Sequence, residues 1–201
     1  VAVGYHAGTS ITTGIQNTLI GSLAGDAITD ADFNTAVGYA ALTDNSLGSK
    51  ATSLGYFALG SQAPTTATDT HNTAVGFNSG AVITTGTLNT FVGSLAGDAT
   101  NDGNNNTAVG FGALSANCGN DNTAVGLGAL AVCTGTDNTA LGSDAAAAVT
   151  SGSNNLCLGH DSGRTGSPGG NIATGSNEMV LGDENITNAY IQVDWTVSSD
   201  A

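Results

Sequence analysis

The side chains with acid–base, nucleophilic or metal-binding chemistry are few, and their spacing builds no site. His6, His71 and His160 stand at different positions of the repeat described below, so they do not converge on a shared metal. Serine, histidine and aspartate all occur, but in so repetitive a chain their co-occurrence does not indicate a catalytic triad. We therefore predict no catalytic residue, no metal ion and no cofactor, and we do not expect an enzyme.

Acidic residues are the abundant charged type. Sixteen acids stand against two bases, Lys50 and Arg164, and the net charge is −14. Nucleic-acid binding needs clustered Lys and Arg to neutralise phosphates, so this composition excludes it and also disfavours an anionic membrane surface. No apolar run approaches the roughly 20 residues of a membrane helix, so we expect no membrane insertion.

Several aspartates stand in predicted turns, where they could bind calcium. Calcium takes six to eight oxygen ligands, but the glycine-rich nonapeptide of calcium-binding β-rolls is absent from this chain. Solvated acids are therefore the preferred interpretation, and calcium is the alternative. The residues concerned are Asp26, Asp44, Asp98, Asp102, Asp121 and Asp137.

Three cysteines leave the redox state open. Cys118 and Cys133 lie about one repeat apart near the same turn, where a disulfide across adjacent coils or two free thiols would both fit. Cys157 replaces the alanine of the repeat and is expected to be a small strand residue.

A five-residue pattern, NTAVG in its clearest copies, recurs along the chain and ends in glycine each time. The closing glycines are Gly4, Gly21, Gly38, Gly55, Gly76, Gly93, Gly110, Gly126, Gly142, Gly159 and Gly182. Successive glycines are 16 or 17 residues apart, with two longer gaps of 21 and 23. A period this steady indicates that each repeat is one structural unit stacked on its neighbours, as in solenoid proteins.

Side-chain alternation within the repeat is that of a strand. We number positions from the closing glycine, which is position zero. Position −1 is Val, Leu or Ile in every copy, and −3 is usually Thr. Because −1 is always aliphatic, we predict that −1 and −3 share the buried face. The predicted core residues are Val37, Val75, Val92, Val109, Val125 and Leu141.

Other repeat positions predict how the backbone runs. Asn at −4 predicts an amide ladder through stacked coils. Position +3 is usually Ala and +4 is Leu or Gly, which we interpret as a second short strand followed by turns rich in Gly, Asn, Asp and Thr. Glycine at zero predicts a bend or a close backbone approach. The clearest examples are Gly38, Gly76, Gly93, Gly110, Gly126 and Gly142.

The predicted fold is all-β: a parallel β-solenoid of about eleven 16–17-residue coils, with two short strands per coil and almost no helix. A strand spacing of about 4.8 Å makes the stack on the order of 50 Å long. The apolar supply of each coil is thin against the backbone entropy that folding must overcome. We therefore expect a homotrimer, in which each chain buries a further face against its partners.

The repeat resembles the head domains of trimeric autotransporter adhesins. NTAVG followed by GxxA is similar to that family's N-S-x-A-I-G repeat and small-residue second strand, from Val1 to about Gly182, although the period here is longer. The resemblance implies a left-handed parallel β-roll and a homotrimer in which each chain forms a complete roll.

The C-terminal segment resembles part of another protein class. After Gly182 the repeat stops, and Ile186 to Ala201 (ITNAYIQVDWTVSSDA) carries alternating apolar residues, as a strand does. It is similar to the segment before the intramolecular chaperone of phage tail fibres and endosialidases, which opens with Ser-Asp and is cleaved off after trimerisation. The resemblance implies an autocleavage junction at Ser199 and Asp200, whose catalytic lysine would lie beyond Ala201.

Two regions follow from these patterns. Residues 1–182 form a predicted β-roll repeat domain, and 183–201 a C-terminal strand or linker leading to a chaperone domain absent from this chain. Val1 stands inside a repeat and no signal peptide is present, so we expect a fragment of a longer protein. Insertions at 61–71 and 160–176 are predicted loops, where binding often resides. The second carries His160, Asp161 and Arg164, as a receptor contact or a plain connector.

These observations favour a non-enzymatic virion fibre protein, such as a phage tail fibre, that displays or spaces a host-receptor-binding surface outside the cell. The expected partners are further copies of the chain, a host receptor (a glycan or an outer-membrane component) and other virion proteins. The first alternative is the head of a bacterial trimeric surface adhesin. The second is a single-chain ice- or glycan-binding solenoid. A flat Thr array at −3 could bind ice, an idea that fails if −3 points inward as predicted.

Overall fold

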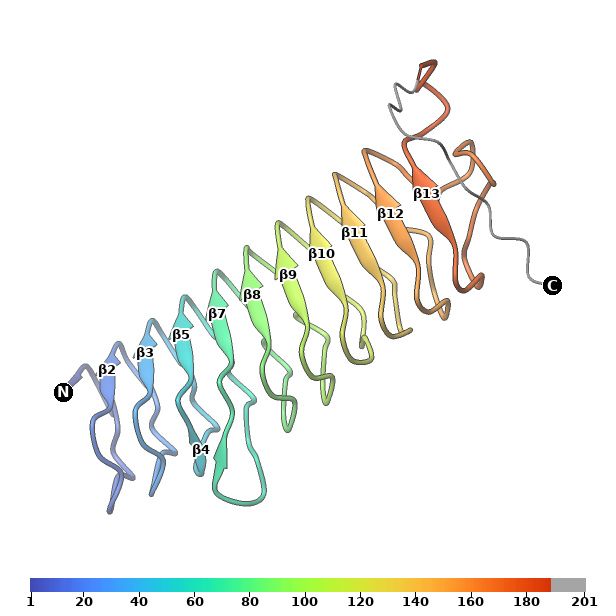
Figure 1. Cartoon of the computed structure of the whole chain (residues 1–201). Helices are drawn as coiled ribbons and strands as arrows, with labels where there is room; N and C mark the ends of the chain where they lie inside the picture. The colour runs from blue at the N-terminus through green and yellow to red at the C-terminus, as the bar shows by residue number, and fades with distance from the viewer. Residues whose placement is uncertain (189–201) are drawn as a thin grey trace.

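A computed structural model describes residues 1–188 and shows a straight stack of turns along one axis (Figure 1). The parallel β-solenoid and the all-β class are confirmed, with turns about 17 residues apart and no helix among the described residues. The number of coils, the hand of the roll and the trimer stay predictions. No helix within residues 1–188 is long and apolar enough to cross a membrane.

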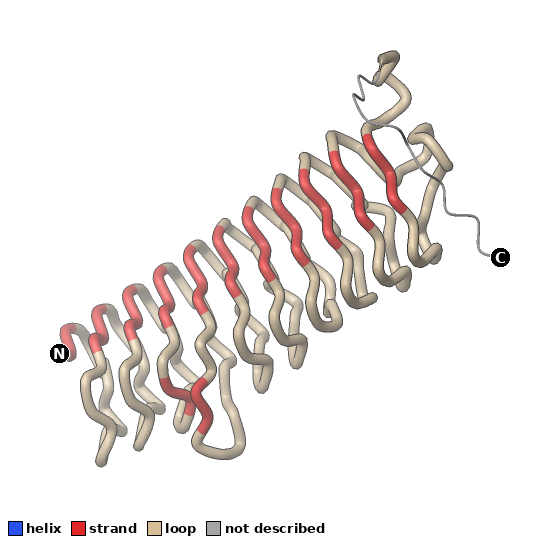
Figure 2. Tube along the Cα trace, in the orientation of Figure 1, coloured by secondary structure: helices blue, strands red, loops and turns tan. Residues whose placement is uncertain are grey.

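One parallel sheet of 11 strands runs the length of the solenoid (Figure 2). Each strand meets the same repeat positions in its neighbours, as Thr73 pairs with Thr90 and Val75 with Val92. The strands, in sheet order, are β1 (Ala2–Val3), β2 (Thr18–Ile20), β3 (Thr35–Val37), β5 (Thr52–Leu54), β7 (Thr73–Val75), β8 (Thr90–Val92), β9 (Thr107–Val109), β10 (Thr123–Val125), β11 (Thr139–Leu141), β12 (Leu156–Leu158) and β13 (Met179–Leu181).

Each turn of the solenoid supplies one strand to this sheet, where we predicted two strands per coil. The segment after the closing glycine bends instead, because Ala40 (φ 50°) and Leu42 (φ 58°) adopt the left-handed backbone region, as do their equivalents in other turns. A residue in that region breaks the extended backbone of a strand. Neighbouring turns still bond here, since the Leu42 N–H donates to the Ala58 carbonyl at 3.0 Å.

The inward face of the strands is not the predicted one. The buried residue is at −2, and the aliphatic −1 residues lie outside: Val92 and Val109 are 36% exposed and Leu141 is 52% exposed. Val37, Val75 and Val125 are half-buried. The alternation was right, but constancy at −1 was wrongly taken as a sign of burial. The inward residues are Leu19, Ala36, Ser53, Ala74, Phe91, Ala108, Ala124, Ala140, Cys157 and Val180.

In most turns a large residue at −2 goes with glycine at +4 and a small one with leucine, although Ala74 with Gly80 and Ala140 with Ala146 depart from this pattern. Where −2 is Phe91, +4 is Gly97, and a Cβ there would lie 2.6 Å from the Phe91 ring. Where −2 is the small Ala108, +4 is Leu114, which is fully buried. Beside Gly80 the space is filled by Phe91 and Leu59 from the neighbouring turns, so the interior stays closely packed.

The predicted amide ladder at −4 is present and buried. Asn106 Oδ1 accepts from the backbone N–H of Asn122 at 3.0 Å, and its Nδ2 donates to the Gly119 carbonyl at 2.9 Å. The same pair of bonds recurs along the stack and satisfies groups that would each cost about 1–3 kcal/mol if buried unpaired. Its members are Asn17, Asn34, Asn72, Asn89, Asn106, Asn122, Asn138 and Asn155.

The first insertion places a glutamine beside a break in this ladder, although its buried Nε2 has no partner. The repeat has Ala51 where Asn is expected, and the longer turn that follows brings in Gln62, which is fully buried. Gln62 Oε1 accepts from Asn72 Nδ2 at 2.9 Å. The insertion also pairs β6 (Thr68–Asp69) with β4 (Gly48–Ser49) in a small parallel sheet. The 61–71 insertion is thus a loop anchored at both ends.

The closing glycines allow the backbones of successive turns to approach closely, as predicted. Gly93 has φ +137°, and a Cβ there would lie 2.5 Å from the carbonyl oxygen of Gly110. Its equivalents share this arrangement: Gly38, Gly76, Gly110, Gly126 and Gly142. The last strand ends at Leu181, close to the predicted domain boundary at 182. The predicted C-terminal strand from Ala189 onward, with Ser199 and Asp200, lies outside the described residues.

Size matching gives a direct test of the inward face. Phe91→Ala is expected to lower the free energy of unfolding by about 3–5 kcal/mol, because it leaves a cavity. Adding Gly97→Leu should restore at least half of that loss, since leucine at +4 fills the space beside a small −2 residue. Urea unfolding of the two single variants and the double variant measures the coupling. Strictly additive losses would show that the two positions do not share one space.

The glycine contact is tested by Gly93→Ala. Backbone strain alone should cost roughly 1–3 kcal/mol, and the contact with the Gly110 carbonyl should add to it. Gly169→Ala is the matched control, because Gly169 also has positive φ (+84°) but nothing lies within 4 Å of an added Cβ. Urea unfolding should show the larger loss at Gly93. Equal losses would contradict the close-approach explanation.

Candidate functional site

The outer face of the main sheet is a continuous stripe of Thr at −3 and aliphatic residues at −1, which we call the sheet stripe. Register keeps each row straight, as Thr107 faces Thr123 and Val109 faces Val125 on the adjacent strand. No charged residue occurs in any of the 11 described strands of this sheet, although the chain carries a net charge of −14. The acids are therefore confined to the turns and loops.

The sheet stripe is larger than the isolated apolar groups common on protein surfaces. At about 4.8 Å per strand and roughly 10 Å of width, 11 strands present on the order of 500 Å². Towards the C-terminal end, −3 also becomes apolar, with Leu156 in β12 and Met179 in β13. The Thr row shares this area with the aliphatic row, and exposed apolar patches of a few hundred Å² are often interaction surfaces.

A second exposed row lies at position +1, immediately after the closing glycines; we call it the aromatic row. The rings of Tyr39, Tyr56 and Phe77 stack with centroids 5.3 and 5.2 Å apart and planes within 16° of parallel. Each ring is about half exposed. The stack follows from register, since the Phe57 N–H donates to the Tyr39 carbonyl and the Asn78 N–H to the Tyr56 carbonyl, both at 2.9 Å.

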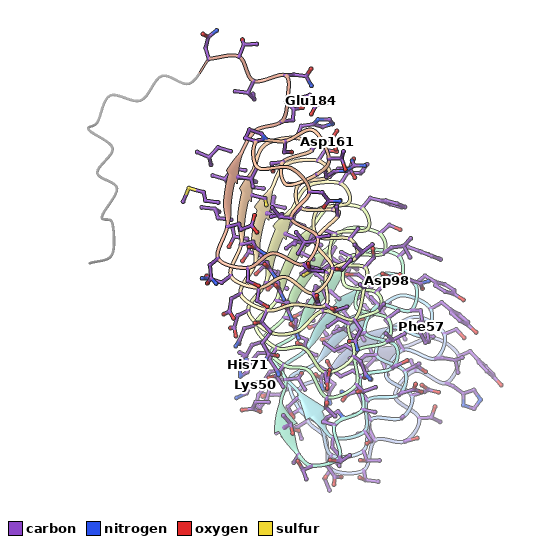
Figure 3. All side chains as sticks on the ribbon, turned by 90° about the vertical axis from the view of Figure 1, so that its right-hand side faces the viewer. Lys50, Phe57, His71, Asp98, Asp161 and Glu184 are labelled. Atoms are coloured by element: carbon purple, nitrogen blue, oxygen red, sulfur yellow. The ribbon has the colours of Figure 1, made fainter. Side chains whose placement is uncertain are left out.

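The two rows point to different sides of the solenoid. In Figure 3 the strands lie on one side, while the labelled Phe57, the residue after Tyr56 of the aromatic row, lies on the opposite side, as does Asp98 in the turn of Ser94. The aromatic row was missed in the sequence. Its signal was present, because the residue after the glycine is Tyr or Phe in five repeats.

The 160–176 insertion brings its predicted residues close together, and its basic side chains lie beside acidic ones of the same chain. The Arg164 guanidinium donates to the Asp161 carboxylate and lies 3.9 Å from an Asp144 oxygen. His160 Nδ1 lies 3.5 Å from Asp161 Oδ2 and 3.6 Å from Asp183 Oδ2. Hydrogen bonds from Asn185 hold the pKa of Asp183 below its usual value. The cation of this loop is engaged by neighbouring acids, which favours the connector over the receptor contact.

The three cysteines are buried free thiols, so Cys118 and Cys133 are not bridged. Thr100 Oγ1 lies 3.1 Å from Cys118 Sγ. Burial raises the pKa of Cys133 and of Cys157 to about 11. Thiols held protonated in this way are poor nucleophiles and poor metal ligands.

The part of the chain that the structure describes has no enclosed site for a ligand or a metal ion. Residues 1–188 contain no pocket and no group of three or more His, Cys, Asp or Glu side chains able to hold a metal ion. Some turn aspartates accept hydrogen bonds from side chains: Asp26 accepts from Thr43, and Asp30 accepts from Thr13 and Thr12, which lower its pKa. The candidate sites are therefore open surfaces.

Comparison with known proteins gives no relative: no protein-family model, curated protein or solved structure matches this chain. The two exposed rows are the features from which a function can be argued.

The buried thiols predict a loss of stability in alkali. The folded chain binds the protons of Cys133 and Cys157 more tightly than the unfolded chain, whose thiols titrate near 9.0. Their contribution is constant below pH 9 and is lost as the pH rises from 9 through 11. Urea unfolding at pH 8 and pH 10.5 should show this fall, and Cys133→Ala with Cys157→Ala should reduce it. An unchanged fall in the double variant would contradict the assignment.

Proposed function

We propose that this chain is a segment of a non-enzymatic structural fibre that assembles as a homotrimer through the sheet stripe. Three rods packed around a common axis would cover the stripe of each chain and leave the acidic turns in solvent. The single observation that carries the proposal is an uncharged, aliphatic face that runs the length of a chain with sixteen acids and two bases. Large apolar faces without charge are typical of permanent interfaces.

The biological setting is proposed from the sequence resemblances. A left-handed roll of about eleven coils is the form expected from the similarity to adhesin heads. The similarity of the C-terminal segment to phage tail fibres supports a virion appendage outside the cell, in contact with other virion proteins and with a glycan or outer-membrane component of the host. A bacterial adhesin head is the alternative, and it would continue into a coiled-coil stalk.

Ice binding is a second candidate, because the Thr residues at −3 do not point inward, which would have excluded it. The Thr residues at −3 point outward in a regular row, from Thr18 in β2 to Thr139 in β11. Two observations weigh against it. The −1 row of the sheet stripe mixes Val, Leu and Ile, whose side chains differ in size, so the face is not flat. The Thr row ends where Leu156 and Met179 take position −3. Trimer assembly and ice binding also compete for the same face.

Oligomeric state is the deciding measurement. Light scattering at micromolar concentration should give three times the chain mass of 19.5 kDa. Val92→Asp with Val109→Asp should convert the trimer to monomer, because each would bury a charge without a partner in the interface. Val82→Asp with Val132→Asp is the matched control, since these valines are similarly exposed (43% and 46%) but lie outside the sheet. It should leave the trimer intact.

The same samples separate the two candidate functions. A wild-type monomer with an intact β-type circular dichroism spectrum would refute the trimer. If that monomer also shows thermal hysteresis in freezing assays, and Thr107→Leu with Thr123→Leu abolishes it, ice binding replaces the proposed function.

A further inference from the structure

The aromatic row is interrupted at one place where a serine takes the position of a ring. Phe77 ends the stack of Tyr39, Tyr56 and Phe77, the next +1 residue is Ser94, and the one after it is Phe111. Register continues through the interruption, since the Leu95 N–H donates to the Phe77 carbonyl at 2.9 Å and the Gly112 N–H to the Ser94 carbonyl at 3.1 Å. We call the space above Ser94, between Phe77 and Phe111, the ring gap.

The width of the ring gap follows from the spacing of the turns. Adjacent rings of the row are 5.2–5.3 Å apart, so Phe77 and Phe111, two turns apart, are separated by about 10 Å. A flat ring placed midway lies about 5 Å from each of them, within the 4.5–7 Å at which rings stack. Phe111 is 56% exposed, more than Tyr56 (49%), which has a ring on both sides.

Two buried acceptor oxygens without a partner belong to the turns of Phe77 and Ser94, which border the ring gap. Asn78 Oδ1, next to Phe77, and Asp98 Oδ1, in the turn of Ser94, are two of the three buried side-chain polar atoms without a partner in residues 1–188. Both residues are half-buried, although the two oxygens themselves are buried. Desolvation raises the pKa of Asp98. A ligand with hydroxyl groups supplies the donors that these oxygens lack.

A partial copy of this arrangement exists near the N-terminus. The sequence GSLAGDA recurs at 21–27 and 93–99, so Ser22 lies between Tyr5 and Tyr39 as Ser94 lies between Phe77 and Phe111. In that copy Asp26 already accepts from Thr43 Oγ1 at 2.5 Å, and Tyr5 packs edge-on against His6. Asp26 and Tyr5 therefore already have partners within the chain, so the gap at Ser94 is the better candidate site.

We propose that the ring gap binds a neutral pyranose unit of a glycan, held between Phe77 and Phe111 and hydrogen-bonded by Ser94, Asp98 and Asn78. A pyranose has two apolar faces for the rings and a rim of hydroxyls for the acceptors. The net charge of −14 repels anionic sugars and phosphates, which selects neutral ones. This inference rests on the proposed fibre function and names the class of its receptor.

The test combines one blocking variant with one matched control. Ser94→Phe supplies the missing ring and closes the gap. Tyr39→Ser removes a ring elsewhere in the row, leaves Phe77 and Phe111 in place and creates no new gap of one serine between two rings. Saturation-transfer NMR and calorimetry with maltohexaose, cellohexaose and mannohexaose should detect binding of at least one to the wild-type chain. Binding should vanish in Ser94→Phe, persist in Tyr39→Ser, and weaken about 2- to 10-fold in Phe111→Ala, which loses one stacking partner.

Four results would overturn the proposal: no binding of any neutral probe, wild-type affinity in Ser94→Phe, loss of binding in Tyr39→Ser, or binding only of sialyllactose or N-acetyl-tyrosinamide. Each sample is also measured by light scattering. A trimer that binds no neutral probe refutes the glycan site alone. A monomer that binds and responds to Ser94→Phe refutes the trimer and keeps the site.

Discussion

In-register stacking of turns is the constraint on which the rest of this structure depends. Each residue lies directly above and below the residue at the same repeat position, at the spacing of parallel strands. A stacked position must therefore tolerate its own copy. Asn does so because its amide both donates and accepts, and glycine does so where the backbones nearly touch. Charged residues do not, because like charges would line up, and they are absent from the described strands of the main sheet.

This constraint explains how much of the fold the sequence could predict. Period, parallel pairing, the Asn ladder and the closing glycines each follow from one conserved position within the repeat, so they were predictable. The buried face was not predictable, because stacking keeps a repeat position constant whether its side chain points inward or outward. The informative signal was the relation between two variable positions, in which Phe91 goes with Gly97 and Ala108 with Leu114. The prediction of a second strand in each coil was wrong because residues such as Leu42 adopt the left-handed backbone region although they are not glycine. Nothing in their residue type signals the bend.

Stacking also creates the two exposed rows, which the sequence predicted only in part. Any side chain that points outward from one turn is repeated on the next, so a single aliphatic position becomes the sheet stripe and a single aromatic position becomes a stack of rings. The interior of each turn is thin, with alanine at many inward positions. A chain of this kind gains stability by covering its apolar stripe with another copy, which is the physical argument for assembly.

The placement of the rows allows both proposals to hold in one particle. The strands lie on one side of the solenoid, and the labelled Phe57, which follows Tyr56 of the aromatic row, lies on the other (Figure 3). Packing three chains through the sheet stripe would therefore leave the aromatic row facing solvent on each of them. Three copies of the ring gap would then be presented around one rigid axis. For a weak site that recognises a single sugar unit, such multiplicity raises the overall affinity for a dense glycan surface without any new contact. Assembly and recognition would thus depend on the same repeat, through different positions within it.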